Sequence, residues 1–140
     1  KGRELGNDAP GEGAAYSGKG FVQLTGETNF EEAEEYIRRE YPEIVASFEA
    51  RTGKRFDLTV GDQPDDQDDP KNAMDPEIAY AVMSYGMRHG EFTGKHLSHY
   101  INDRVTDYVN ARRIINGTDR AKLIMAHALR FQDALKKGGW

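Results

Sequence analysis

YSGKGFVQLTGETNF, residues 16–30, is the stretch that decides the fold of this chain. Lys19 lies between two glycines, and a short run of alternating apolar and polar residues follows it. The alternation predicts an extended piece in which Gln23 and Thr25 point to the same side, because they are two residues apart. Asn29 follows at the start of a predicted helix. Two amides and a hydroxyl suit sugar hydroxyls or an ordered water, which need neutral donors and acceptors.

A simpler interpretation of the same stretch is a capped turn before a helix, with Gln23 and Thr25 in solvent and no ligand. Short motifs of this kind also match by chance. Spacing alone therefore leaves both interpretations open.

The residues after this stretch have the period and the end signals of helices. Thr28 begins a capping-box pattern, which predicts a helix over residues 28–41. Pro42 disfavours helical geometry in the residue before it and suits the first turn of a new helix. A second helix is therefore predicted over residues 42–52, closed by Gly53.

Helices are also predicted throughout the second half of the chain. Asp75 is a candidate N-cap for a helix that ends near Gly90. A short helix around residues 95–102 and another over residues 106–115 follow. Asp119 is the expected cap of a last helix, whose apolar stripe recurs at helical spacing. That stripe consists of Ala121, Ile124, Ala128, Phe131 and Leu135.

These patterns predict one all-α, or α-dominated, domain over residues 1–140 with at most one small β-hairpin. Residues 1–20 hold six of the 15 glycines and are expected to be irregular. Residues 54–74 carry no period and include an acidic run. That run lacks the register of an EF-hand loop, so we expect a solvated insertion rather than a calcium site.

Composition excludes several classes of protein. The 140 residues suit one domain, and the absence of Cys excludes a disulfide scaffold, a thiolate nucleophile and a zinc–thiolate site. The net charge of −5 argues against nucleic acid as a partner, since such binding needs a basic face. No apolar run approaches the roughly 20 residues of a membrane span. His96 and His99 share a helix face but lack a third ligand, so we expect no metal site.

Residues 16–30 closely resemble the Y-x-G-[RK]-G-[FPL]-[IV]-Q-[LI]-[TS]…N-[YF] signature of family 19 glycoside hydrolases. These include plant-type chitinases and phage and bacterial peptidoglycan hydrolases with a lysozyme-like helical fold. Three more segments resemble family motifs in the same order, namely residues 5–13, 69–79 and 113–117. Residues 92–95 resemble the phage-type members and favour peptidoglycan over chitin. The resemblance implies the C-terminal portion of a lysozyme-like, endolysin-type hydrolase domain.

The resemblance also implies roles for individual residues. Thr25 matches the Ser or Thr that helps to hold the attacking water, and Gln23 and Asn29 match amides that bind the substrate. Lys19 replaces the commoner Arg, which keeps the charge but loses the bidentate fork. The remaining substrate-binding residues implied by the resemblance are Tyr16, Arg113 and Asn116.

The implied reaction is hydrolysis of a β-1,4 bond beside an N-acetylated sugar, with inversion and no cofactor. Inversion needs two carboxyl groups about 6.5–9.5 Å apart. In the family the main catalytic Glu precedes the glycine-rich lead-in, so we expect it upstream of Lys1. Glu12 is the first candidate for the second carboxylate, with Glu4 and Asp8 as alternatives. All three also fit solvated loop carboxylates.

Three functions stay open from the sequence. The first is a monomeric cell-wall hydrolase that acts in the bacterial wall or periplasm on peptidoglycan or chitin oligosaccharides. A separate wall-binding domain is then expected, because a net charge of −5 does not favour anionic walls. The second is a non-catalytic glycan-binding or structural module of a phage tail or secretion assembly. The third is an unrelated helical interaction domain.

Overall fold

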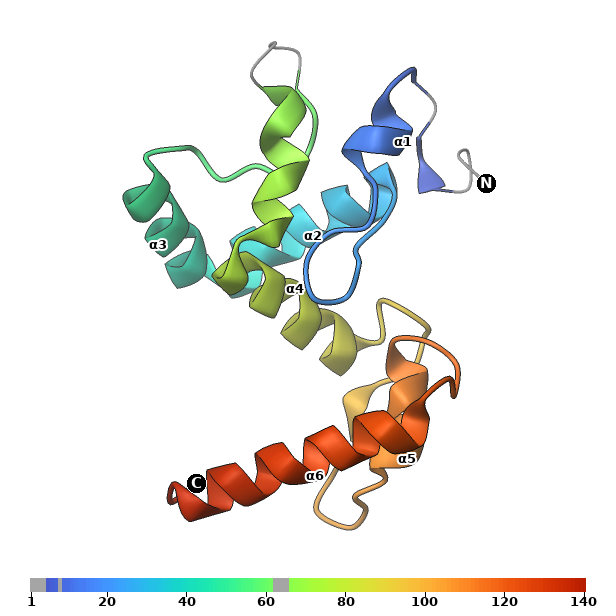
Figure 1. Cartoon of the computed structure of the whole chain (residues 1–140). Coiled ribbons are helices and arrows are strands. Elements are labelled where there is room, and N and C mark those ends of the chain that lie inside the picture. The colour runs from blue at the N-terminus through green and yellow to red at the C-terminus, as the bar shows by residue number, and fades with distance from the viewer. Residues whose placement is uncertain (1–4, 8, 62–65) are drawn as a thin grey trace. The chain divides into compact units, whose positions relative to one another are not determined.

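The computed structural model of the chain describes residues 5–7, 9–61 and 66–140. It divides into two compact units, an N-terminal unit, Lys1–Tyr85, and a C-terminal unit, Gly86–Trp140 (Figure 1). Helices dominate both units, and no strand occurs in the three described ranges. The helix-dominated class predicted from the sequence is therefore confirmed.

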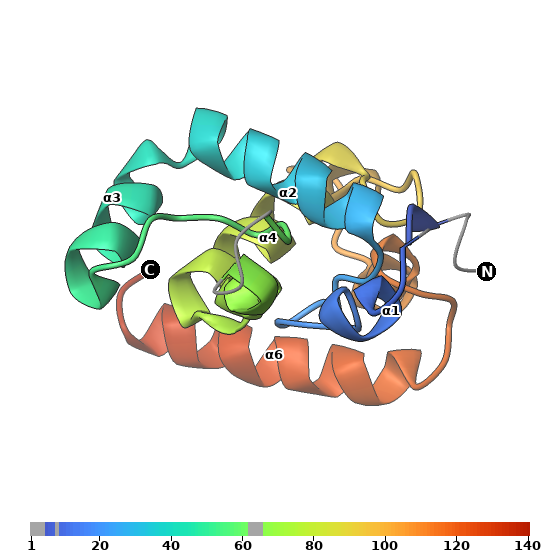
Figure 2. The same cartoon turned by 90° about the horizontal axis from the view of Figure 1, so that it is seen from above.

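The N-terminal unit is built from helices and the segments that connect them. Its second and third helices meet at a bend at Tyr41, where a new helix starts at Pro42 (Figure 2). The third helix ends at Gly53, whose φ of 68° is left-handed, so both of its predicted ends are confirmed. The elements of this unit are α1 (Glu12–Ala15), α2 (Glu27–Glu40), α3 (Pro42–Thr52), the 3-10 segment η2 (Asp66–Met74) and α4 (Pro76–His89), which continues into the C-terminal unit.

The start of α2 corrects the predicted capping box. The helix begins one residue before Thr28, and no side chain of its own caps it. Instead, Asn7, in the glycine-rich segment at the start of the chain, accepts a hydrogen bond from the Glu27 backbone N–H at 2.9 Å. Gly26, with φ of 93°, makes the turn into the helix. The cap comes from 20 positions away, so no local pattern indicates it.

Aromatic side chains form the core of the N-terminal unit. Tyr16 and Phe30 meet edge to face with ring centroids 5.3 Å apart, and Phe48 and Phe56 do so at 5.9 Å. Each such burial stabilises the fold by about 1.5–3 kcal/mol. The largest fully buried side chains of this unit are Tyr16, Phe30, Ile37, Phe56, Leu58, Pro70 and Ile78.

A polar cluster ties α3 to the start of α4. Asp75 accepts hydrogen bonds from both terminal nitrogens of Arg51, at 2.8 and 3.1 Å, and also from the Glu77 backbone N–H at 3.1 Å. It thus caps α4 as predicted. Burial raises the pKa of Asp75, but these donors outweigh burial and hold it below its usual range.

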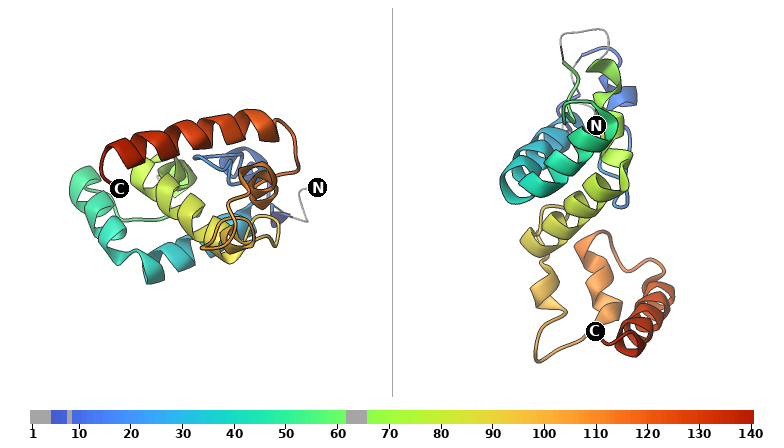
Figure 3. Two further views of the ribbon diagram at one scale, coloured as in Figure 1. Left: turned by 90° about the horizontal axis from the view of Figure 1, so that it is seen from below. Right: turned by 90° about the vertical axis from the view of Figure 1, so that its left-hand side faces the viewer.

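The C-terminal unit is held around one long helix. Its elements are η3 (Leu97–His99), α5 (Tyr108–Ala111), η4 (Arg112–Ile114) and α6 (Ala121–Lys137), and α5 lies beside α6 (Figure 3). The helix predicted over residues 106–115 is thus split into an α turn and a 3-10 turn. Asp107 caps α5 by accepting from the Asn110 backbone N–H at 3.0 Å.

Two local predictions for the C-terminal unit are wrong. The helix expected around residues 95–102 is only the 3-10 turn η3. Asp119 does not cap α6, because Arg120 precedes the helix with a φ of 52° and no side chain accepts from the first turn. Within the described ranges, every helix is too short or too polar to cross a lipid bilayer.

Candidate functional site

The stretch 16–30 forms a closed turn rather than the extended piece that its alternation predicts. Lys19 and Leu24 pair through both backbone hydrogen bonds, at 3.0 and 2.8 Å. Gly20 has φ of 69° and Gln23 has φ of 56°, and these two left-handed residues turn the chain. The Gly26 N–H then donates to the Tyr16 carbonyl at 2.9 Å and closes the base of the turn. We call residues 16–26 the lead-in turn.

Three polar side chains meet along the exposed edge of the lead-in turn. The Thr25 hydroxyl donates to the Gln23 carbonyl at 2.8 Å, and the Asn29 amide donates to the Thr25 carbonyl at 2.6 Å. The Gln23 amide donates to the Gly20 carbonyl at 3.2 Å. Each of these bonds fixes one side chain on a backbone carbonyl of the lead-in turn. That the three side chains serve one ligand stays a prediction. We call Gln23, Thr25 and Asn29 the polar edge.

Gly18 makes the close approach within the polar edge possible. A Cβ at this position would lie 2.9 Å from Oε1 of Gln23 and 3.3 Å from Oγ1 of Thr25. Both side chains therefore lie against the Gly18 backbone. A larger residue would push them apart.

The polar edge offers neutral hydrogen-bonding groups to a ligand. The Thr25 hydroxyl donates its proton in a hydrogen bond to the Gln23 carbonyl. Its lone pairs can therefore accept hydrogen bonds from a water or a sugar hydroxyl. The amide oxygens of Gln23 and Asn29 are acceptors, and each amide nitrogen has a second proton. Such a set recognises hydroxyl and acetamide groups rather than charged ones.

Tyr16, expected to bind substrate, is part of the core instead. Its side chain is completely buried against Phe30, and its hydroxyl accepts from the Val60 backbone N–H at 2.9 Å. Burial raises the pKa of the phenol. A fully buried ring does not contact a sugar, so the role that the structure assigns to Tyr16 is to hold the lead-in turn in place.

Lys19, which the resemblance matches to a substrate-binding position, is also turned inward. Only 8% of the residue is exposed, and its ammonium group donates to the carbonyls of Ala15 and Ser17 and lies 5.6 Å from the centre of the Phe30 ring. Burial lowers the pKa of this ammonium group. The ammonium group thus stabilises the end of α1, where the carbonyls face it, instead of facing a substrate.

Glu12 lies at the start of α1 and is partly exposed. Its carboxylate accepts from the Ala9 backbone N–H at 2.7 Å. This contact closes the turn before α1. The role of Glu12 as the second catalytic carboxylate stays a prediction. Glu4 and Asp8, the alternative carboxylates, lie outside the described residues.

Arg113 and Asn116 belong to the C-terminal unit and are both exposed. Asn116 accepts from the Gly117 backbone N–H at 2.8 Å, and Arg113 donates to the Asn110 side chain at 3.2 Å. The Thr93 hydroxyl donates to the Arg113 carbonyl at 2.8 Å and links the 92–94 connector to this loop. Five of the eight predicted site residues therefore lie in or beside the lead-in turn, and the sixth, Glu12, lies at the start of α1. Arg113 and Asn116 lie in the C-terminal unit.

Glu34 is a half-buried carboxyl that the sequence does not single out. Burial raises its pKa, and its two oxygens accept from the Leu58 backbone N–H at 2.9 Å and from Arg38 at 2.8 Å. Its partial burial has no local signal, because the covering segment, residues 56–58, has no period. The Leu58 bond holds that segment on α2, and the Arg38 bond lies within α2, so both contacts are structural.

Histidines and acids do not cluster in the part of the chain that the structure describes. No group of three or more His, Asp or Glu side chains is placed there to hold a metal ion. His96 and His99 pack ring against ring at 4.9 Å, and His99 accepts from the His96 backbone N–H. This pair therefore closes the η3 turn.

No protein-family model, curated protein or solved structure matches this chain. The functional assignment therefore depends on the quoted motifs and on the geometry of the polar edge.

Proposed function

We propose that this chain binds the β-1,4-linked, N-acetylated glycan of the bacterial cell wall and serves its hydrolysis with inversion. The single observation that carries the proposal is the polar edge, where Gln23, Thr25 and Asn29 are fixed side by side on an exposed turn. The resemblance of residues 16–30 to family 19 glycoside hydrolases supports the same function. The proposed place of action is the wall or periplasm.

The geometry of Thr25 suits a residue that orients the attacking water. Its proton is already engaged by the Gln23 carbonyl, so its oxygen accepts a hydrogen bond from the water. A lone pair of the water is then left to attack the sugar carbon. A positioning contact of this kind affects turnover more than ground-state binding.

The charges around the polar edge support a neutral saccharide as the part that is recognised. The three side chains are uncharged, and the nearby ammonium group of Lys19 is bound to backbone carbonyls. The sugar backbone, rather than the acidic peptide stems of peptidoglycan, is the proposed ligand. Peptidoglycan is preferred over chitin on the resemblance of residues 92–95.

The two carboxyl groups of the reaction come from the resemblance. The general acid is proposed on a helix that precedes the glycine-rich segment at the start of the chain, as in family 19. Glu12 is proposed as the second carboxylate. The acid needs a raised pKa and the base an ionised carboxylate on the far side of the sugar.

A second candidate function is glycan binding without hydrolysis. Glu34, a carboxyl whose pKa is raised by burial, has both oxygens occupied by Leu58 and Arg38. These contacts give Glu34 a structural role. In this alternative the polar edge binds sugar and no bond is cleaved.

Kinetics and binding of Thr25 variants test the proposal. Release of reducing ends from solubilised peptidoglycan, by a protein in which the proposed acid-bearing helix precedes this chain, gives kcat and KM. Amide shifts of residues 18–29 in this chain give the affinity for chitotetraose. Thr25→Ala is expected to lower kcat about 100-fold with KM nearly unchanged. Thr25→Ser is expected to restore most of the loss. Thr28→Ala, an exposed Thr just outside the edge, is the matched control.

The outcomes separate the two functions from each other and from the absence of both. Saturable shifts with hydrolysis support the hydrolase, and saturable shifts without hydrolysis support the binding module. Absence of shifts at residues 18–29 contradicts both.

A further inference from the structure

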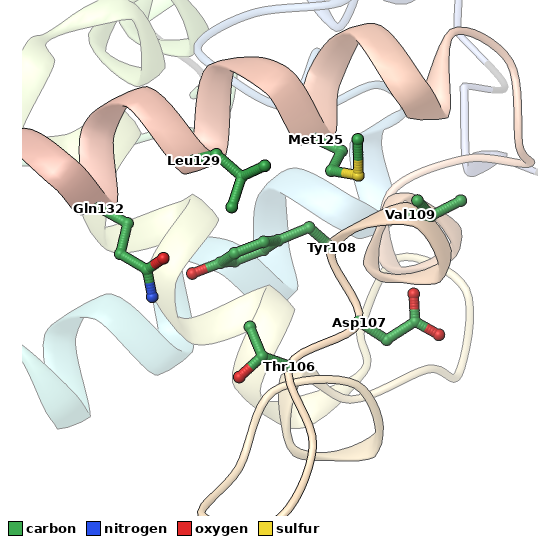
Figure 4. Close-up of a pocket in the computed structure, with 7 residues that line it drawn as sticks. All are labelled: Thr106, Asp107, Tyr108, Val109, Met125, Leu129 and Gln132. Carbon is green, nitrogen blue, oxygen red and sulfur yellow. The ribbon is translucent and has the colours of Figure 1, made fainter.

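A groove of about 380 Å³ lies between α5 and α6 within the C-terminal unit. Figure 4 shows the ring of Tyr108 extending along this groove, with Leu129 above it in that view. Met125 and Val109 complete the apolar part of the lining. The volume and the largely apolar lining are typical of sites for one small ring-sized ligand.

Neutral polar groups stand around this apolar part. Gln132 of α6 lies at the end of the groove toward which the Tyr108 hydroxyl points, and Thr106 lies on the side of the ring opposite Leu129 in that view (Figure 4). An amide, a phenol and an alcohol donate and accept hydrogen bonds without charge. The groove thus combines an aromatic surface with neutral hydrogen-bonding groups.

The only charged group in the lining is an acid. Asp107 accepts from the Asn110 backbone N–H at 3.0 Å and from the Asn110 side chain at 2.7 Å. The backbone contact above all holds the pKa of Asp107 below its usual range, so it is ionised at neutral pH. No cation lines the groove, all of whose residues are described. Phosphates, carboxylates and other anions are therefore disfavoured.

We propose that this groove binds one uncharged 2-acetamido sugar of a glycan chain, at a site separate from the polar edge. The C–H face of the sugar ring packs on Tyr108, and the acetamide methyl group lies against Met125 and Leu129. Gln132 and Thr106 exchange hydrogen bonds with hydroxyl or acetamide groups. The inference rests on the proposed function, because that function makes glycan the ligand that the chain meets.

The site then contributes binding and not chemistry. A sugar of the glycan binds on the C-terminal unit independently of the polar edge.

An amide-resolved titration of the isotope-labelled chain with chitotriose tests the inference. The amides of Tyr108, Leu129 and Gln132 are expected to shift saturably. Gln132→Leu, which keeps the size of a partly exposed side chain, is expected to weaken binding in the groove about fivefold. His127→Gln, on the same helix but outside the lining, is the matched control and is expected to change nothing.

Tyr108→Ala removes the aromatic surface and is expected to weaken this binding about tenfold or more. Circular dichroism checks that α5 and α6 remain folded; if they do not, Gln132→Leu decides alone. Muramyl dipeptide, which carries a carboxylate, is expected to shift the groove amides less than chitotriose because Asp107 repels it.

The groove and the polar edge report separately in this experiment. Groove amides that stay silent, or an affinity equal in the wild type and in Gln132→Leu, overturn the groove while the polar edge is still scored by residues 18–29. Groove shifts with silent residues 18–29 support the groove and contradict the proposed function.

Discussion

The two compact units bury their apolar side chains to very different degrees. In the N-terminal unit Phe30, Ile37 and Phe56 are completely buried, and the aromatic pairs of this unit interlock. In the C-terminal unit Ile114 is completely buried, whereas Phe131 of α6 is 73% exposed. The exposed large apolar side chains of this unit are Val105, Leu123, Ile124, Leu129, Phe131, Leu135 and Trp140.

This difference shows which interactions stabilise each unit. The N-terminal unit is held by hydrophobic burial, which stabilises in proportion to the apolar area removed from water. The C-terminal unit relies more on individual hydrogen bonds, such as those of Asp107 at α5 and of Thr93 to the Arg113 carbonyl. The lead-in turn, with the polar edge, therefore stands on the better-packed unit.

Truncation of one Phe in each unit is the strongest test of this comparison. Phe30→Ala is expected to lower the free energy of unfolding by about 3–5 kcal/mol, because it leaves a cavity beside Tyr16. Phe131→Ala is expected to lower it by less than about 1 kcal/mol, because the ring is mostly in solvent. Urea unfolding followed by circular dichroism measures both. Equal losses would contradict the difference in packing.

Two glycines with similar backbone angles give the next largest effect. Gly20 and Gly94 have φ of 69° and 71°. A Cβ at Gly20 would lie 2.7 Å from the Ala73 carbonyl oxygen, whereas a Cβ at Gly94 would meet nothing within 4 Å. Gly94→Ala is expected to cost about 1–2 kcal/mol from the backbone angle alone. Gly20→Ala is expected to cost about 1–3 kcal/mol more, and equal unfolding midpoints would show that the lead-in turn is loosely packed.

Asp75→Asn sharpens the comparison through pH. The pKa of Asp75 is lower in the folded than in the unfolded chain, so its contribution is present above the unfolded value of about 3.9 and is lost as pH falls through the folded value. Asn still caps α4 but loses the charge. The variant is expected to be less stable by up to about 1 kcal/mol at pH 7, since Arg51 is exposed.

The difference between Asp75→Asn and wild type should narrow as pH falls below the unfolded value and vanish below the folded pKa of Asp75, where both chains lack this charge. Urea unfolding at pH 7, 4 and 3 measures it. Asp107→Asn, the N-cap of α5, is the matched change in the C-terminal unit, and its smaller difference should follow the same direction. A difference for Asp75→Asn that does not depend on pH would contradict the role of the Arg51 pair.

Most helices of this chain could be predicted because their signals are local. Pro42 and Gly53 mark both ends of α3, and Asp75 caps α4 within three residues of its own position. The start of α2 could not be predicted, since its cap, Asn7, is distant in sequence. The partial burial of Glu34 could not be predicted for the same reason, since residues 56–58, which cover it, are distant in sequence.

The candidate site was predictable in composition but not in orientation. The sequence indicated that Gln23 and Thr25 would share one side of an extended piece, whereas the structure places them in a closed turn, with Asn29 bonded to the Thr25 carbonyl. It did not indicate that Tyr16 and Lys19 are buried. A Tyr and a Lys beside glycines look exposed until the long-range contacts with Phe30 and Val60 are known.

The substitution Gly18→Ala tests the central claim about the polar edge most directly. The new Cβ would lie 2.9 Å from Oε1 of Gln23 and would displace side-chain ends but not backbone. We expect the affinity for chitotetraose, read from the Asn29 amide shift, to fall about 5- to 30-fold with an unchanged melting temperature. Gly13→Ala, where the Cβ meets nothing within 4 Å, should leave the affinity unchanged. An affinity equal in Gly18→Ala and the wild type would contradict the claim that the polar edge binds glycan.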